Sequence, residues 1–120
     1  MRVELTREFR FEAAHRLPAV PQDHPCGRMH GHGYRVEVRV AGPVDPTLGW
    51  LIDFGDIDAR FEPLRAALDH RVLNEVEGLE NPTAEHLAHW IFDRLRADLP
   101  IIESVTVWET ARSSCTYRGR

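Results

Sequence analysis

Residues 26–33, Cys-Gly-Arg-Met-His-Gly-His-Gly, constrain the fold most, because they join a metal-ligand pattern to a strand pattern. His30 and His32 are two residues apart, so their side chains point to one face if the backbone is extended. Four apolar residues downstream share the parity of these histidines: Tyr34, Val36, Val38 and Val40. If the strand is continuous, the two imidazoles extend its apolar face and lie at the rim of a core.

One further ligand would complete a three-histidine metal site, and His15 is the best candidate. It ends an alternating run on the parity of Phe9 and Phe11. A catalytic zinc ion commonly takes three protein ligands and leaves a fourth position open. Histidines also recur in loops for reasons of turn geometry or solvation, and that alternative stays open, but the spacing favours the metal site.

Length and composition narrow the class of protein. The 120 residues fit a single domain, residues 1–120, with a substantial core. No apolar run approaches the roughly 18 residues of a membrane span, and the N-terminus lacks an apolar signal core. The expected location is therefore the cytoplasm, where two cysteines argue against a disulfide framework.

The charged residues exclude some functions. All 15 basic residues are arginine, and the net charge is −4. Without lysine, Schiff-base chemistry and a P-loop lysine are excluded. The net negative charge gives no reason to expect a nucleic-acid partner, because binding nucleic acid needs a basic face.

Hydrophobic periodicity predicts four strands and two helices. Asp53 and Thr83 are the expected N-caps of the two helices, and Pro63 is expected to kink or divide the first. The elements in chain order are strands over 2–14 and 33–41, helices over 53–69 and 83–99, and strands over 101–110 and 114–119. This ββααββ order indicates an antiparallel α+β arrangement, and the open edges of a four-stranded sheet favour a homo-oligomer.

Cys26 is a candidate for a reactive thiolate. It lies in a loop rich in glycine and proline, beside Arg28 and close to the metal candidates, and nearby positive charge favours the thiolate form. A free cysteine is commonly a packed small hydrophobe instead. The closeness to the histidines favours a functional role.

Asp69 and His70 are adjacent at the expected end of the first helix. A carboxylate that orients an imidazole makes a proton relay. A histidine at a helix C-terminus is also favoured by the helix dipole alone, and the sequence does not separate these interpretations.

Glu109 shares the parity of Val105 and Val107 in a predicted strand. A carboxylate on the apolar side of a strand needs a partner or a ligand. A flat heterocycle with an amino group and a ring N–H would supply paired donors, whereas the alternative is a salt bridge with Arg112. If the parity is reversed, Glu109 is solvated and Trp108 belongs to the core.

With these residues in place, the chain closely resembles the 6-pyruvoyltetrahydropterin synthase family over essentially its whole length. The segments that carry the resemblance are residues 11–17, 26–32, 68–70, 79–85, 109–110 and 115–119. Three residues separate Cys26 from His30, a spacing similar to that of the branch that forms 6-carboxytetrahydropterin for queuosine synthesis. In the pyruvoyl-forming relatives the cysteine typically stands farther from the His-Gly-His motif.

The resemblance implies the tunnelling fold, with two helices on one side of the sheet. It also implies that subunit sheets join into a twelve-stranded barrel in a trimer, and that two trimers stack as a homohexamer. Active sites then lie between subunits. The implied site residues are zinc ligands His15, His30 and His32 with one Zn²⁺ per subunit, catalytic residues Cys26, Asp69 and His70, and substrate-binding residues Glu109 and, more loosely, Thr83.

The resemblance further implies a carbon–carbon lyase. Its substrate would be 7,8-dihydroneopterin triphosphate, and its products 6-carboxy-5,6,7,8-tetrahydropterin, acetaldehyde and triphosphate. Two alternatives stay open: a 6-pyruvoyltetrahydropterin synthase that eliminates triphosphate without cutting the carbon chain, and a non-catalytic zinc- or pterin-binding protein. In the last case Cys26 could be a fourth, structural zinc ligand.

Overall fold

The computed structural model describes residues 1–120, which form one five-stranded sheet and two α-helices. Along the sheet the strand order is β3-β1-β2-β4-β5. Only β3 runs parallel to its neighbour β1. The elements are β1 (Arg2–His15), β2 (His30–Pro43), α1 (Phe54–Leu68), β3 (Arg71–Val72), α2 (Ala84–Arg96), β4 (Ile102–Thr110) and β5 (Ser113–Tyr117), with short 3₁₀ turns at Pro25–Gly27 and Leu73–Glu75.

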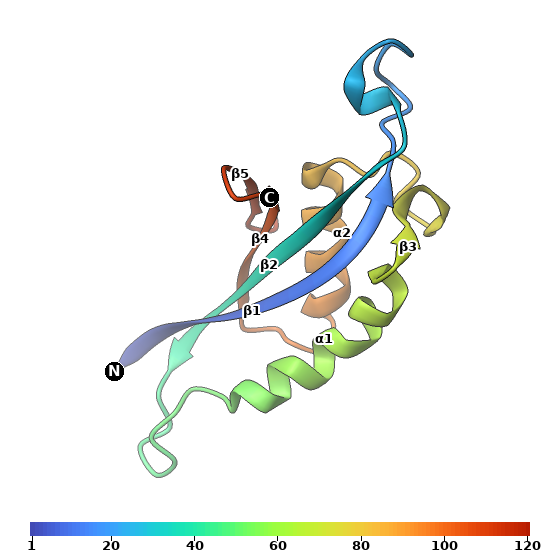
Figure 1. Cartoon of the computed structure of the whole chain (residues 1–120). Coiled ribbons are helices and arrows are strands. Elements are labelled where there is room, and N and C mark those ends of the chain that lie inside the picture. Colours follow the sequence, from blue (N-terminus) through green and yellow to red (C-terminus); the bar gives the residue numbers. More distant parts are fainter.

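A long hairpin of β1 and β2 runs along most of the length of the molecule (Figure 1). The two strands pair without interruption from Arg2 opposite Pro43 to His15 opposite His30. Residues 16–29 connect them as a loop that projects beyond the sheet (Figure 1). The fold is correspondingly elongated, with extents of 58 × 23 × 22 Å.

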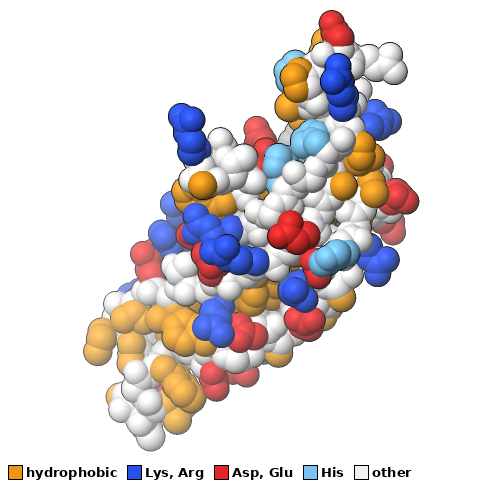
Figure 2. All heavy atoms as spheres, in the orientation of Figure 1, with side chains coloured by type: hydrophobic (Ala, Val, Ile, Leu, Met, Phe, Trp, Pro, Cys, Tyr) orange, Lys and Arg blue, Asp and Glu red, His pale blue; other side chains and the backbone are white.

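Both helices pack on one face of the sheet. A single core of 20 buried residues contains strand side chains of one parity, such as Val36, Val38 and Val107, together with Phe61 of α1 and Ile91 of α2. The opposite face carries charged side chains of both signs (Figure 2). This alternation is what an antiparallel sheet with one covered face requires.

The prediction of a four-stranded, wholly antiparallel sheet was wrong in one detail, because it missed β3. This strand has two residues, paired with Ala13 and Ala14 of β1, and two residues are too few to show a period. The element order is therefore ββαβαββ. All four predicted strands and both helices are present, with boundaries shifted by at most three residues.

Two outcomes were expected at Pro63, a kink or a division of the first helix, and the division does not occur. Helix α1 continues from Phe54 to Leu68 with Pro63 inside it. Proline removes the hydrogen bond to the carbonyl four residues earlier, which is that of Ala59. Pro63 and Ala59 are both exposed, so water can hydrate the carbonyl that proline leaves free.

Neither α1 nor α2 combines the length and apolar character that a membrane-crossing helix needs.

We expect Phe61→Ala to destabilise the protein by about 3–5 kcal/mol, because it empties a fully buried site. The Phe61 ring stacks on Phe9 at 4.0 Å between centroids. The matched control is Phe54→Ala on the same helix, where the ring is 42% exposed and the loss should not exceed about 1 kcal/mol. Urea unfolding at one protein concentration measures both, and equal losses would contradict the assigned core.

Candidate functional site

The pairing of β1 with β2 brings three histidines together. His15 pairs with His30, and His32 pairs with Ala13, so all three side chains lie on the helix-covered side at one end of the sheet. His15 is 1% exposed, and His30 and His32 are half-buried. One nitrogen from each ring lies within 4.8 Å of the others, a cluster that can hold a metal ion. The predicted grouping of these three residues is thus confirmed.

Two backbone carbonyls fix the orientation of the rings. Nδ1 of His15 lies 2.8 Å from the carbonyl oxygen of Pro82, and Nδ1 of His30 lies 2.7 Å from that of Arg28. A carbonyl oxygen only accepts, so each contact calls for a proton on Nδ1 and leaves a lone pair on Nε2. Carbonyl partners of this kind are typical of metal-ligating histidines.

The remaining nitrogens fit a divalent cation. Nε2 of His15 and Nε2 of His30 are 3.1 Å apart. Two facing lone pairs repel at that distance unless a cation or a proton lies between them. With Zn–N bonds of 2.0–2.1 Å at a tetrahedral angle, two ligand nitrogens lie roughly 3.3 Å apart. Burial lowers the pKa of His15, which favours the neutral imidazole that a metal binds.

Cys26 is not a member of this cluster. It lies in the 3₁₀ turn of the projecting loop, half-buried, and its thiol forms no hydrogen bond. Its backbone carbonyl accepts from the Leu17 N–H at 2.8 Å, which ties the two ends of the loop together. The three histidines therefore make an open site in this chain, rather than a closed four-ligand site that includes the sulfur.

Glu109 lies beside the histidines. Its Oε1 is 4.0 Å from Nε2 of His15, and its side chain is 27% exposed. It occupies a bulge in the pairing of β4 with β5, and bulges of this kind redirect side chains at functional sites.

The neighbours of Glu109 settle its parity. Trp108 points to the opposite face, where its indole N–H donates to Glu37 at 3.1 Å. The alternative salt bridge with Arg112 is not formed; the backbone N–H of Arg112 donates to Thr110 instead. The carboxylate is therefore free to meet a ligand next to the histidine cluster.

The N-terminus of α2 closes one side of the cluster. Thr83 is the N-cap, as predicted, and its hydroxyl accepts from the His86 N–H at 3.1 Å. The residue before it, Pro82, supplies the carbonyl that holds His15. The start of α2 therefore also positions the carbonyl that orients His15.

Asp69 and His70 form a pair, as the sequence suggests. Oδ1 of Asp69 lies 3.0 Å from Nδ1 of His70 and accepts from the Glu12 N–H at 3.0 Å. That backbone N–H, then His70 and Arg65, lower the pKa of Asp69 and keep it ionised. The ring of His70 pairs with a carboxylate rather than with the last helix carbonyls, so its position reflects more than the helix dipole.

The backbone of His70 is strained. Its φ is +58°, the one positive φ outside glycine, and its N–H donates to the Glu12 carbonyl at 2.6 Å. Such conformations cost of order 1–3 kcal/mol and cluster at functional sites. The imidazole itself is exposed.

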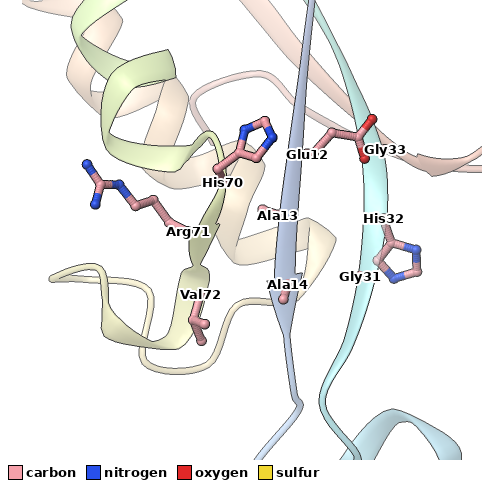
Figure 3. A pocket seen from close by; sticks show the side chains of 9 residues that line it. All are labelled: Glu12, Ala13, Ala14, Gly31, His32, Gly33, His70, Arg71 and Val72. Carbon is pink, nitrogen blue, oxygen red and sulfur yellow. The ribbon is translucent and has the colours of Figure 1, made fainter.

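Figure 3 shows the hollow that His70 borders. His70 and eight residues of β1, β2 and β3 line it: Glu12, Ala13, Ala14, Gly31, His32, Gly33, Arg71 and Val72. The imidazoles of His70 and His32 point to different sides of the β1–β2 ribbon (Figure 3). No hydrogen bond or ion pair joins the Asp69–His70 pair to the three-histidine cluster within one chain.

Two groups that contact His15 were not predicted from the sequence to belong to the site. Tyr34, 1% exposed, places its hydroxyl 3.2 Å from Nδ1 of His15. Its parity with His32 was visible in the sequence, but a tyrosine among valines looks like ordinary core. Burial, and then the charge of Glu109, raise the pKa of this phenol and keep it protonated. The carbonyl of Pro82 has no sequence signal, because it comes from 67 residues away.

Comparison with known proteins points to one family. The profile described as 6-pyruvoyl tetrahydropterin synthase matches residues 4–120. A 6-carboxy-5,6,7,8-tetrahydropterin synthase of Synechocystis sp. is 43% identical over 117 residues, covering 92% of this chain and 89% of the relative. A dihydroneopterin monophosphate aldolase of Pyrococcus furiosus is 30% identical and covers 91% of each chain.

The fold has a close counterpart among solved structures. The 6-pyruvoyl tetrahydropterin synthase of Caenorhabditis elegans superposes with a TM-score of 0.93 at 29% identity. The match covers 100% of this chain and 97% of the other. The names of these relatives describe more than one reaction.

We expect His30→Ala to weaken zinc binding at least about 100-fold. Even the loss of a group that only hydrogen-bonds to a metal ligand typically lowers metal affinity 10–100-fold. The matched control is His86→Ala, because the His86 ring makes the same kind of Nδ1 contact, 2.7 Å from the Asn81 carbonyl, but lies outside the cluster. Elemental analysis after dialysis, with chelator competition, measures both. Equal zinc content in the two variants would contradict the assigned cluster.

Proposed function

Because the chain belongs to the 6-pyruvoyl tetrahydropterin synthase family, we propose that it is a zinc-dependent carbon–carbon lyase. The proposed reaction converts 7,8-dihydroneopterin triphosphate to 6-carboxy-5,6,7,8-tetrahydropterin, acetaldehyde and triphosphate, as a cytoplasmic step of queuosine synthesis. The observation that carries the proposal is the 43% identity with the Synechocystis carboxytetrahydropterin synthase over most of both chains. The short spacing between Cys26 and His30 agrees with it.

The proposed metal ligands are His15, His30 and His32, through the nitrogens that face one another. Zn²⁺ bound there would act as a Lewis acid, which makes protons next to a coordinated hydroxyl easier to remove. The chain supports this role by holding the rings with the Pro82 and Arg28 carbonyls. It leaves the fourth position open, since no sulfur or carboxylate joins the cluster.

The proposed acid–base groups are Cys26 and His70. The Cys26 thiolate would accept a proton from the substrate side chain, and His70 would move protons on another face. Asp69 orients His70 through the 3.0 Å contact with Nδ1, so the free Nε2 faces solvent or substrate. The anionic Asp69 also stabilises the imidazolium that forms when His70 takes a proton.

The proposed pterin anchor is Glu109. Its carboxylate can accept two hydrogen bonds from an amino group and a ring N–H, and it lies next to His15. A heterocycle held there would present its side chain to the histidine cluster. Thr83, the N-cap of α2, is proposed as a further contact with the pterin.

A complete site is proposed to need more than one chain. In one chain, the thiol of Cys26 and the imidazole of His70 are not joined to the histidine cluster, although the proposed reaction needs all three at one substrate. Both edge strands, β3 and β5, are short and uncovered by another strand. We therefore propose the homohexamer of two stacked trimers, with sites between subunits.

The alternative function is the pyruvoyl-forming synthase, which eliminates triphosphate and leaves the carbon chain intact. The close superposition on the Caenorhabditis elegans enzyme favours it as the second candidate. A non-catalytic zinc protein is the third candidate, and the open three-ligand cluster argues against it.

Product analysis separates these candidates. Zinc-loaded protein is incubated with 7,8-dihydroneopterin triphosphate, the pterin is identified by mass, and acetaldehyde is assayed. We expect 6-carboxytetrahydropterin with acetaldehyde. Pyruvoyltetrahydropterin without acetaldehyde would move the function to the second candidate, and no turnover with zinc bound would favour the third.

We expect Cys26→Ala to keep its zinc and lose turnover by about 100-fold or more, the range of a general base. The thiol is not part of the histidine cluster, so metal content and the unfolding midpoint should stay at wild-type values. Cys26→Ser should be almost as inactive, because a hydroxyl is a far weaker base at neutral pH than a thiolate. Loss of zinc from either variant, measured by elemental analysis, would overturn the assigned role.

A further inference from the structure

The loop of residues 16–29, which carries Cys26, takes little of its shape from the hydrophobic core. It projects beyond the sheet (Figure 1), and none of its residues is buried. Neither the core nor the half-buried apolar residues packed against it include a member of this loop. Segments with few apolar contacts open most readily, so hydrogen bonds within the loop must hold Cys26 in place.

His24 takes part in three hydrogen bonds around the turn that contains Cys26. Its Nδ1 accepts from the Cys26 N–H at 3.0 Å, and its carbonyl accepts from the Gly27 N–H at 2.9 Å. Its own N–H donates to the Pro21 carbonyl at 2.9 Å. A Cβ on Gly27 would lie 2.9 Å from that carbonyl oxygen, so the turn packs directly against it. His24 therefore joins the turn to the preceding part of the loop.

The proline after His24 favours the contact between the imidazole and Cys26. Pro25 has no N–H, so the first donor of the 3₁₀ turn is the N–H of Cys26. A residue before proline is restricted to extended backbone, and His24 has φ −69° and ψ 137°. Side chains of cap residues in this conformation reach the N–H groups of the first turn, a task that Ser, Thr, Asp or Asn usually performs. In His24 the imidazole Nδ1 takes the place of the usual oxygen.

Both backbone polar groups of Cys26 are held. Its N–H donates to His24, and its carbonyl accepts from the Leu17 N–H at 2.8 Å. Leu17 lies two residues after His15, so this second contact ties Cys26 to the end of β1. The two contacts together fix the point from which the thiol can reach a substrate.

We propose that His24 is a positioning residue for Cys26, which acts by accepting the Cys26 N–H at Nδ1. The inference rests on the proposed function, in which Cys26 takes a proton from the substrate side chain. A general base must lie within hydrogen-bond reach of the proton that it removes. Loss of the contact therefore lowers turnover, whereas the metal ligands and the proposed pterin anchor, which lie outside the loop, keep their affinities.

The test is a pair of substitutions at position 24. His24→Ala removes the acceptor, whereas His24→Asn supplies an Oδ1 that can accept from the N–H two residues on. We expect His24→Ala to lower kcat about three- to tenfold, the effect of one neutral hydrogen bond on the population of the productive loop. Its KM and zinc content should stay at wild-type values. His24→Asn should recover about half or more of the wild-type kcat, because asparagine is a good cap residue.

A second readout does not depend on activity. Hydrogen exchange of the loop amides reports whether the Cys26 N–H is held. This amide should exchange about three- to tenfold faster in His24→Ala than in the wild type, and slowly again in His24→Asn. The matched control is Gln22→Ala, because the Gln22 side chain is exposed in the same loop and forms no hydrogen bond. Its turnover and amide exchange should match the wild type.

The remaining outcomes also decide. Equal losses of turnover in His24→Ala and His24→Asn would assign the effect to the ring rather than to the acceptor atom and overturn the inference. Loss of zinc or a lower unfolding midpoint in His24→Ala would make His24 a general structural residue, with the same consequence. A wild type that binds zinc without turnover would overturn the proposed function and this inference together. If Cys26→Ala is inactive and His24→Ala keeps wild-type turnover and exchange, the proposed function stands and this inference alone fails.

Discussion

The pairing of β1 with β2 is the interaction on which the rest of the structure depends. Its uninterrupted antiparallel register places His15 opposite His30 at the last pair of the hairpin. A slip of one residue would turn His30 and His32 to the charged face, because successive side chains alternate. The valines of β2 prevent such a slip, since they would leave the core together with the histidines. Core packing and site assembly are therefore specified by one register.

The same strand also holds the Asp69–His70 pair. The backbone of Glu12 donates to Asp69 and accepts from His70, three residues before His15. These two hydrogen bonds lie next to the short parallel pairing of β3 with β1 and extend the contacts along that edge of β1. The strained His70 conformation is maintained because these contacts surround it. Strand β1 thus contacts both the histidine cluster and the Asp69–His70 pair, which no hydrogen bond or ion pair joins within one chain.

Backbone carbonyls, rather than charged side chains, organise the histidine cluster. Pro82 and Arg28 supply the two acceptors, one from the start of α2 and one from the end of the projecting loop. Neutral acceptors orient the rings without adding charge to a partly buried site, where an unpaired charge would be costly. Glu109 is the nearest carboxylate, and its bulge aims it at the cluster from β4. The site is thus assembled from three regions of the chain around one sheet end.

Local pattern alone determined much of this protein. Alternation along β1 and β2 predicted both strands and the shared face of His15, His30 and His32, since strand parity depends only on neighbouring residues. The caps Asp53 and Thr83 likewise follow from short-range hydrogen bonding. Only the tertiary structure decided the rest: β3, the parity of Glu109, and the contacts of His15 with Tyr34 and Pro82. Each of these depends on segments far apart in sequence, and no local period records which of them will meet.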